Sequence, residues 1–255
     1  MITEKIREQL AQSAEAEYQS FQAKLLPGVD GILGVRLPQL RQLAKQTAKQ
    51  DALAYLQEMK ELTAHGTVLC YEEKMLFGLV TGYARMDDPQ RKYWLDVFVP
   101  VIDSWGVCDS CCMTYKWMKK QPEFWWEYLN KWLSSETEYG IRFGFVSMLA
   151  HFVDEEHLQQ IFACCSQTRP DKKQNSYQDS YQDNNQDNNQ DKDYYAKMAQ
   201  AWLVSVCFAK FPDQTYSFLK TDTMDDFTHN KSIQKTCESY RVSKEWKAAI
   251  RSLRR

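Results

Sequence analysis

Apolar residues recur every three or four positions along most of the chain, which is the spacing of a helix that buries one face. Strand-like alternation is nearly absent. One helical segment begins near Ile6 and includes Phe21, another follows Pro38, and the pattern predicts further helices at 50–60, 70–85, 89–103, 105–119, 122–134, 137–151, 154–166, 193–209, 212–220, 227–239 and 243–254. The sequence therefore predicts an all-α protein.

The even spacing of these segments predicts helix pairs rather than a single bundle. One antiparallel pair for every roughly 30 to 40 residues is typical of α-solenoids of the HEAT or armadillo type. Composition agrees, because 9 Gly and 7 Pro are few for a chain of 255 residues and turns are therefore scarce. We expect one HEAT-like-repeat domain over residues 1–255, with a concave face.

Residues 167–193 differ in kind from the rest of the chain. They contain Ser-Tyr-Gln-Asp twice and Asn-Asn-Gln-Asp twice in tandem, with almost no apolar side chain to bury. This composition predicts a low-complexity, disordered loop inserted into the helical domain.

The chain begins with charged residues, and its longest apolar stretch, near 201–209, is too short to span a membrane. We expect a cytoplasmic protein whose eight cysteines are reduced. Cys108 and Cys111 have Cys-x-x-Cys spacing, and with the pair Cys164-Cys165 they allow a zinc site as an alternative. Buried helical cysteine in an aromatic-rich core is the favoured interpretation.

Positive charge is concentrated at the C-terminus, although the formal net charge of the whole chain is −2. In the predicted last helix, Lys244, Lys247, Arg251 and Arg254 recur three or four positions apart. They predict a ridge of DNA phosphate contacts. The alternative is a solvated face near a helix C-terminus, where the dipole favours cations. In that case the DNA track is expected around Arg36, Arg41, Lys45 and Arg142.

Common catalytic motifs are missing from the sequence. It has no GxxxxGK[ST], no GxGxxG after a strand, no HExxH and no GxSxG. These absences argue against nucleoside triphosphate, dinucleotide and serine-hydrolase chemistry.

Four residues remain as candidates for chemistry. Trp105 and Asp109 are four positions apart, so on a helix the indole and the carboxylate share a face. Arg142 and Trp202 lie in otherwise apolar helical segments. The structural alternative is that the tryptophans belong to the core and that Asp109 is a helix cap or a partner of Lys116.

At these residues the chain resembles the AlkD-type DNA alkylation repair family, the HEAT-like-repeat DNA glycosylases. The resemblance runs in order through GVRLPQLRQLAK (34–45), YEEKMLFGLV (71–80), SWGVCD (104–109), the segments of Arg142 and Trp202, and HNKSIQKTCESYR (229–241). It covers nearly the whole chain except the low-complexity segment.

The resemblance implies a role for each candidate. Trp105 and Trp202 line the cleft around the damaged nucleotide, Asp109 is the catalytic carboxylate, and Arg142 holds backbone phosphate nearby. The segment before residue 34 departs from the better-studied branch, where an aromatic and a basic residue contact DNA. Phe21 and Lys24 are the weaker candidates for those contacts.

The chemistry so implied is hydrolysis of the N-glycosidic bond of cationic N3- or N7-alkylated purines in duplex DNA. Such a purine is already a good leaving group, so a carboxylate and aromatic faces that stabilise positive charge suffice. No metal or organic cofactor, no membrane and no obligate protein partner is expected. The alternatives are a non-catalytic HEAT-like protein that binds distorted or branched DNA and a scaffold for proteins.

Overall fold

The structure is a computed structural model that describes residues 1–166 and 193–255. Within these ranges the regular elements are fourteen α-helices and two short 3-10 helices, and there is no strand. The all-α, helical-repeat prediction is confirmed. The low-complexity segment predicted at 167–193 lies outside the described residues except for Asp193. In the described part of the chain, no helix is both long enough and apolar enough to cross a bilayer.

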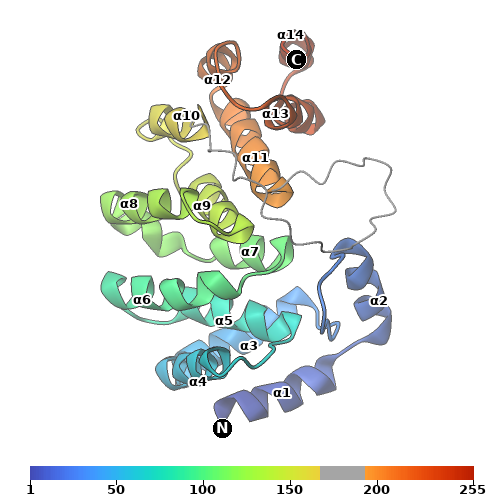
Figure 1. The fold of residues 1–255 in the computed structure, drawn as a ribbon, viewed down its shortest axis with the longest axis vertical. Helices are drawn as coiled ribbons and strands as arrows, with labels where there is room; N and C mark the ends of the chain where they lie inside the picture. Colours follow the sequence, from blue (N-terminus) through green and yellow to red (C-terminus); the bar gives the residue numbers. More distant parts are fainter. Residues whose placement is uncertain (167–192) are drawn as a thin grey trace. The chain divides into compact units, whose positions relative to one another are not determined.

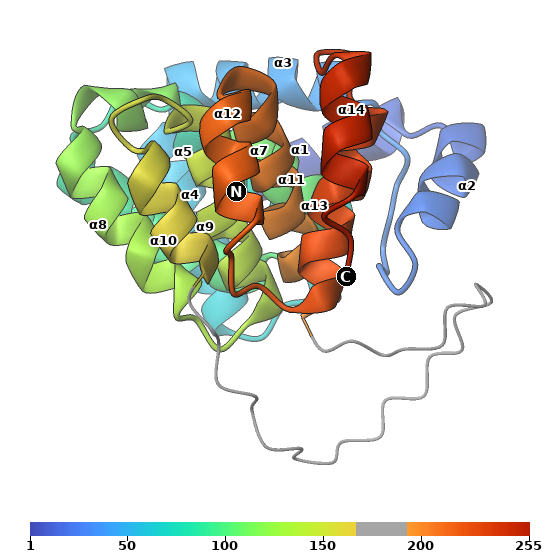
Figure 2. The same cartoon turned by 90° about the horizontal axis from the view of Figure 1, so that it is seen from above.

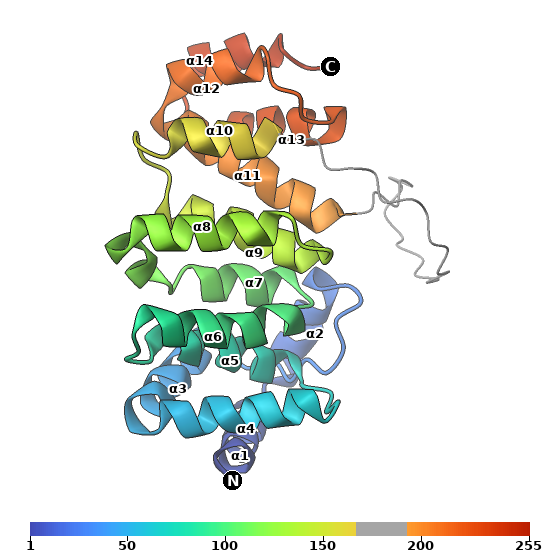
Figure 3. The same ribbon diagram turned by 60° about the vertical axis from the view of Figure 1, so that its left-hand side comes forward.

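The chain divides into two compact units, residues 1–121 and 122–255. Unit 1 contains α1 (Ile2–Ser13), α2 (Ala16–Leu25), α3 (Leu37–Gln50), α4 (Ala52–Ala64), α5 (Tyr71–Tyr83), α6 (Asp88–Phe98), η1 (Val99–Val101), α7 (Trp105–Cys112) and η2 (Lys116–Lys120). Helix α5 packs between α3 and α7, while α4 and α6 form the neighbouring row (Figure 1; Figure 3). Helix α1 packs against α4. The prediction of a single domain over 1–255 stays a prediction.

Unit 2 contains α8 (Pro122–Leu133), α9 (Glu138–His151), α10 (Leu158–Ser166), α11 (Tyr194–Lys210), α12 (Pro212–Leu219), α13 (Asp226–Glu238) and α14 (Lys244–Arg251). Helix α11 packs against α9 on one side and α13 on the other (Figure 1). Helix α14 runs beside α13 (Figure 2), and its Trp246 ring lies 5.6 Å from the ring of Phe208 on α11.

Several predicted helices are shorter than expected. The first segment breaks between Ser13 and Ala16, where the N–H of Glu15 donates to the carbonyl of Gly34 at 3.1 Å. The segment predicted at 89–103 ends as an α-helix at Phe98 because Pro100 cannot continue it. The segment predicted at 105–119 ends at residue 112, after which η2 begins at residue 116.

The cysteines expected in the core are there. Cys108, Cys111, Cys112 and Cys207 are fully buried within helices, where they pack as small apolar side chains. Cys70, at the N-cap of α5, is half-buried.

Candidate active site

Helix α7 and the segment that follows it lie directly against α5, which has glycine at two positions that face them. A Cβ atom at Gly78 would collide with the side chain of Cys111, and one at Gly82 would collide with Thr114. The hydroxyl of Tyr115 donates a hydrogen bond to the carbonyl of Gly78 at 3.2 Å. Both α7 and the segment that follows it are therefore anchored on the backbone of α5.

Trp105 and Asp109 lie on one accessible face of α7. Ser104 caps the helix, and its Oγ accepts a hydrogen bond from the N–H of Val107 at 3.4 Å. Trp105 and Asp109 are both half-buried, while the three residues between them are buried. Positions four apart share a helix face, so this indole and this carboxylate are on the same side of α7.

A buried carboxylate fixes the loop between α2 and α3. Glu72, on α5, has no exposed surface and accepts hydrogen bonds from three successive backbone N–H groups, those of Leu33 at 3.0 Å, Gly34 at 2.8 Å and Val35 at 3.2 Å. Gly34 has a φ of +88°, and a Cβ atom there would come within 2.5 Å of the carbonyl oxygen of Glu15. The carbonyl of Gly34 accepts a hydrogen bond from the N–H of Glu15, and through it the loop holds the N-terminal end of α2 in place.

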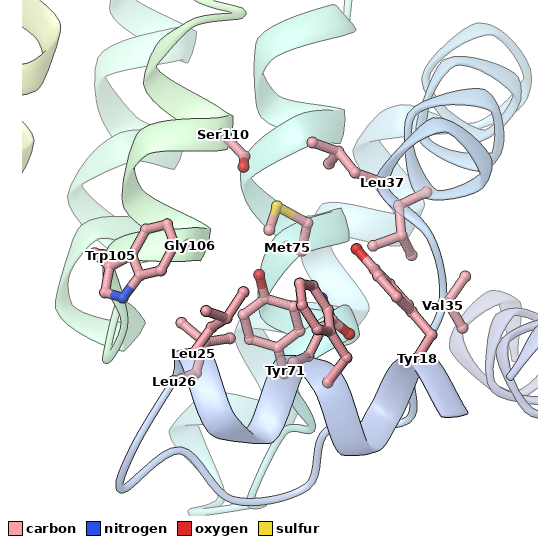
Figure 4. Close-up of a pocket in the computed structure, with 13 residues that line it drawn as sticks. Tyr18, Leu25, Leu26, Val35, Leu37, Tyr71, Met75, Trp105, Gly106 and Ser110 are labelled. Atoms are coloured by element: carbon pink, nitrogen blue, oxygen red, sulfur yellow. The ribbon is translucent and has the colours of Figure 1, made fainter. Parts of the chain in front are cut away.

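Trp105 also lines a pocket of about 150 Å³ within unit 1, the Trp105 pocket (Figure 4). The other walls include Tyr18, Phe21 and Gln22 of α2, Leu40 of α3, and Tyr71 and Met75 of α5. Tyr71 and Met75 are buried, whereas Phe21 is 56% exposed. The pocket thus has a buried floor and an exposed rim.

In unit 2, Arg142 lies in the interior and binds the backbone of α11. The side chain is on α9, and the residue is 6% exposed. Its Nη1 donates a hydrogen bond to the carbonyl of Tyr195 at 2.7 Å, and Glu138 accepts one from the N–H of Tyr195 at 2.5 Å. Burial raises the pKa of Glu138, although the Tyr195 N–H opposes this shift. These two α9 side chains hold the first turn of α11.

Trp202 lies on the same helix, α11, and is half-buried. Trp105 and Asp109 belong to unit 1, whereas Arg142 and Trp202 belong to unit 2. Each pair is therefore placed within its own unit, and Arg142 supports the helix that carries Trp202.

The predicted C-terminal ridge is on α14 only in part. Lys244 and Arg251 are exposed and Lys247 is half-buried, as phosphate contacts require. Arg254 was expected on the same helix, but α14 ends at Arg251. Lys24, at the end of α2, is exposed.

A second set of cations lies on α3. Arg41, Lys45 and Lys49 recur four positions apart and line one open hollow. The Nε atom of Arg41 is buried without a hydrogen-bond partner in the described residues, and the Lys45 Nζ lies 5.4 Å from the ring centre of Tyr83. The sequence analysis gave Arg41 and Lys45 only as an alternative DNA track. It missed Lys49, although Lys49 follows Lys45 at the same spacing of four residues. In contrast, Arg36 is paired with Glu15 at 2.9 Å.

Sequence reasoning also missed the Trp105 pocket and its glutamine. Gln22 is a polar residue in a segment with a weak apolar pattern, so neither its burial nor a pocket beside it is visible in the sequence. Among the described residues, no three His, Cys, Asp or Glu side chains gather as a metal site.

The chain was compared with known proteins. A family model described as "DNA alkylation repair enzyme" matches residues 6–237. No match was found among curated proteins or among solved structures. The matched range includes Trp105, Asp109, Arg142 and Trp202, whereas α14 lies beyond it.

Proposed function

Because the chain belongs to the family of DNA alkylation repair enzymes, we propose that it is a DNA glycosylase. Its substrate in this proposal is duplex DNA with a purine alkylated at N3 or N7, and its products are the free base and an abasic site. The observation that carries the proposal is the placement of Trp105 and Asp109 on one accessible face of α7, anchored on the backbone of α5.

The chemistry follows from the charge of the substrate. The bond between C1′ of the sugar and the purine nitrogen breaks, and its electron pair neutralises the cationic base. Positive charge then develops on the sugar, where the carboxylate of Asp109 stabilises it and orients a water molecule. The water oxygen bonds to C1′, and its proton is released to solvent. The indole of Trp105 offers its face to the cation, worth roughly 0.5–2 kcal/mol. No metal or organic cofactor takes part in this scheme.

The residues of unit 2 have supporting roles in the proposal. Trp202 contacts DNA through its aromatic face, in the role that the family resemblance implies. Arg142 contacts a backbone phosphate in the role that the family resemblance implies, and its hydrogen bond to Tyr195 also makes it a positioning residue for α11. Further phosphates are contacted by the exposed cations Lys24, Lys244 and Arg251 and by the half-buried Lys247.

Base release tests the proposal directly. The protein is incubated with duplex DNA that contains N7-methylguanine, and free 7-methylguanine is measured by chromatography under single-turnover conditions. We expect release by the parent protein and a rate about 10²- to 10³-fold lower in Asp109→Asn, because the lost charge acts mainly in the transition state. Duplex affinity is expected to change little.

A matched control is available in the loop just before α7. Asp103 is an exposed carboxylate that pairs with Lys74 at 2.5 Å, and Asp103→Asn is expected to keep the parent rate. Equal rates for Asp109→Asn and the parent would exclude Asp109 from the mechanism. A parent protein that binds the duplex and releases no base would instead be a non-catalytic DNA-binding protein.

A further inference from the structure

The first turn of α11 is capped by a side chain from another helix. Asp193 precedes the helix with a φ of +74°, and its side chain makes no cap hydrogen bond within the described residues. Glu138 of α9 supplies the acceptor instead. It receives the N–H of Tyr195 at 2.5 Å, and the backbone of Ala196 also hydrogen-bonds to its carboxylate. Backbone N–H groups in the first turn of a helix have no acceptor within the helix, so this cap satisfies them from outside.

Three side chains of α9 bind the same residue of α11. Arg142, one turn after Glu138, donates a hydrogen bond to the carbonyl of Tyr195 at 2.7 Å. The ring of Tyr139 stacks on the ring of Tyr195, with 5.7 Å between the centroids and 23° between the planes. The N–H, the carbonyl and the ring of Tyr195 are thus all held from α9. We name this set of three α9 residues the Tyr195 clamp, and it fixes α11 both along its axis and in rotation.

Trp202 lies on the face of α11 that the clamp holds. It follows Tyr195 by seven residues, which is close to two helical turns, so both residues share a face and are about 10 Å apart along the axis at ~1.5 Å per residue. Trp202 is half-buried, so part of its indole is accessible. Because a helix turns as one body, any rotation at Tyr195 changes the direction of the Trp202 indole by the same angle.

We propose that Glu138 is a positioning residue for DNA contact, which holds the first turn of α11 so that the Trp202 indole is presented to DNA. This inference rests on the proposed function, in which Trp202 contacts DNA. Glu138 itself touches no DNA in this scheme and acts through α11. It is also the member of the clamp that isolates the positioning effect, because Arg142 has a proposed phosphate contact as well.

The first experiment follows Trp202 without DNA. In protein that contains 5-fluorotryptophan, the ¹⁹F signal of Trp202 is assigned through Trp202→Phe. We expect Glu138→Ala to shift or broaden this signal and to leave the signal of Trp105 unchanged, because Trp105 belongs to unit 1. Glu138→Gln keeps an acceptor for the N–H of Tyr195. Its Trp202 signal is therefore expected nearer to that of the parent than the signal of Glu138→Ala.

The second experiment is a double-mutant cycle on base release from duplex that contains N7-methylguanine, at limiting protein concentration. Glu138→Ala is expected to slow release about three- to tenfold, within the range for the loss of one aromatic contact with a cation. In the background of Trp202→Ala, the same change is expected to slow release by no more than about twofold, because the residue through which it acts is already absent. A general loss of stability would instead multiply the two effects.

Asp87 provides a matched control. It is an exposed carboxylate that caps α6 in unit 1 by accepting the N–H of Gln90 at 2.9 Å. Asp87→Ala removes a helix cap of the same chemistry. It is expected to leave both the Trp202 signal and the rate of base release at the values of the parent.

The proposal is overturned if the Trp202 signal of Glu138→Ala equals that of the parent, or if the effects of Glu138→Ala and Trp202→Ala multiply. Should Glu138→Ala fail to fold, Glu138→Asp, whose carboxylate is one methylene shorter, takes its place in both experiments. A parent protein that binds duplex and releases no base would contradict the glycosylase proposal alone. The same cycle measured on duplex affinity then decides whether Glu138 positions Trp202.

Discussion

Replacement of Glu72 by glutamine tests the contact that positions α2 and the Trp105 pocket. In the structure, one carboxylate oxygen accepts the N–H groups of Gly34 and Val35, and the other accepts that of Leu33. A glutamine carbonyl can keep the first two hydrogen bonds, but its amino group then faces the N–H of Leu33. One bond becomes a contact between two donors, and the remaining two lose the help of the negative charge.

The magnitude follows from these three bonds. A hydrogen bond to a charged group contributes about 1.5–3 kcal/mol and a neutral one about 1 kcal/mol, while a buried unsatisfied N–H costs about 1–3 kcal/mol. Glu72→Gln is therefore expected to lower the free energy of unfolding by about 3–4 kcal/mol. For a chain of this size that corresponds to a Tm lower by roughly 10 °C.

Glu58 provides the matched control, since it also accepts two backbone N–H groups, those of Ile2 at 3.0 Å and Thr3 at 2.9 Å. It is only half-buried, so water can replace the lost bonds, and Glu58→Gln is expected to cost less than about 1 kcal/mol. Thermal unfolding gives both values, and hydrogen exchange is expected to show faster exchange of the 33–35 amides in Glu72→Gln alone. Equal melting temperatures for the parent and Glu72→Gln would refute the reasoning.

Two further predictions concern DNA contacts and a thiol. The double variant Arg41→Gln/Lys45→Gln is expected to weaken binding to damaged and undamaged duplex alike and to flatten the slope of log K against log salt by up to ~2. If α14 also contacts phosphates, Lys247→Gln/Arg251→Gln is expected to weaken duplex binding and flatten the salt slope in the same way. A salt dependence of binding equal to that of the parent protein would exclude this pair from the DNA contacts. Burial raises the pKa of the Cys207 thiol to about 12, so it stays protonated at pH 8, and a thiol reagent is expected to label it only when the protein unfolds.

The helices were predictable from the sequence because apolar spacing and helix-breaking residues are local signals. Pro38 stands at the beginning of α3, and Pro89 lies in the first turn of α6, whose N-cap is Asp87. The gap between α1 and α2 was not predictable. No proline or glycine marks it, and the extended backbone there is fixed by the hydrogen bond from Glu15 to Gly34, a contact between residues distant in sequence.

The candidate site was predictable where one helix carries both partners. A shared face for Trp105 and Asp109 needs only helical spacing, and both residues are on α7. Arg142 was harder to interpret, because a cation in an apolar helix suggests an external anion. Its hydrogen bond to the carbonyl of Tyr195 joins residues 53 positions apart, and no sequence pattern could indicate that partner.

Two of the segments that carry the family resemblance prove to be one structural device. Glu72 belongs to the segment 71–80, and the backbone that it holds includes Gly34 and Val35 of the segment 34–45. The carbonyl of Gly34 in turn accepts the N–H of Glu15, at the beginning of α2. A change at Glu72 is therefore transmitted through the loop to α2, whose one buried side chain lines the Trp105 pocket. Loss of this carboxylate should therefore loosen α2 and the wall of the Trp105 pocket that α2 forms, as well as lower the stability of unit 1.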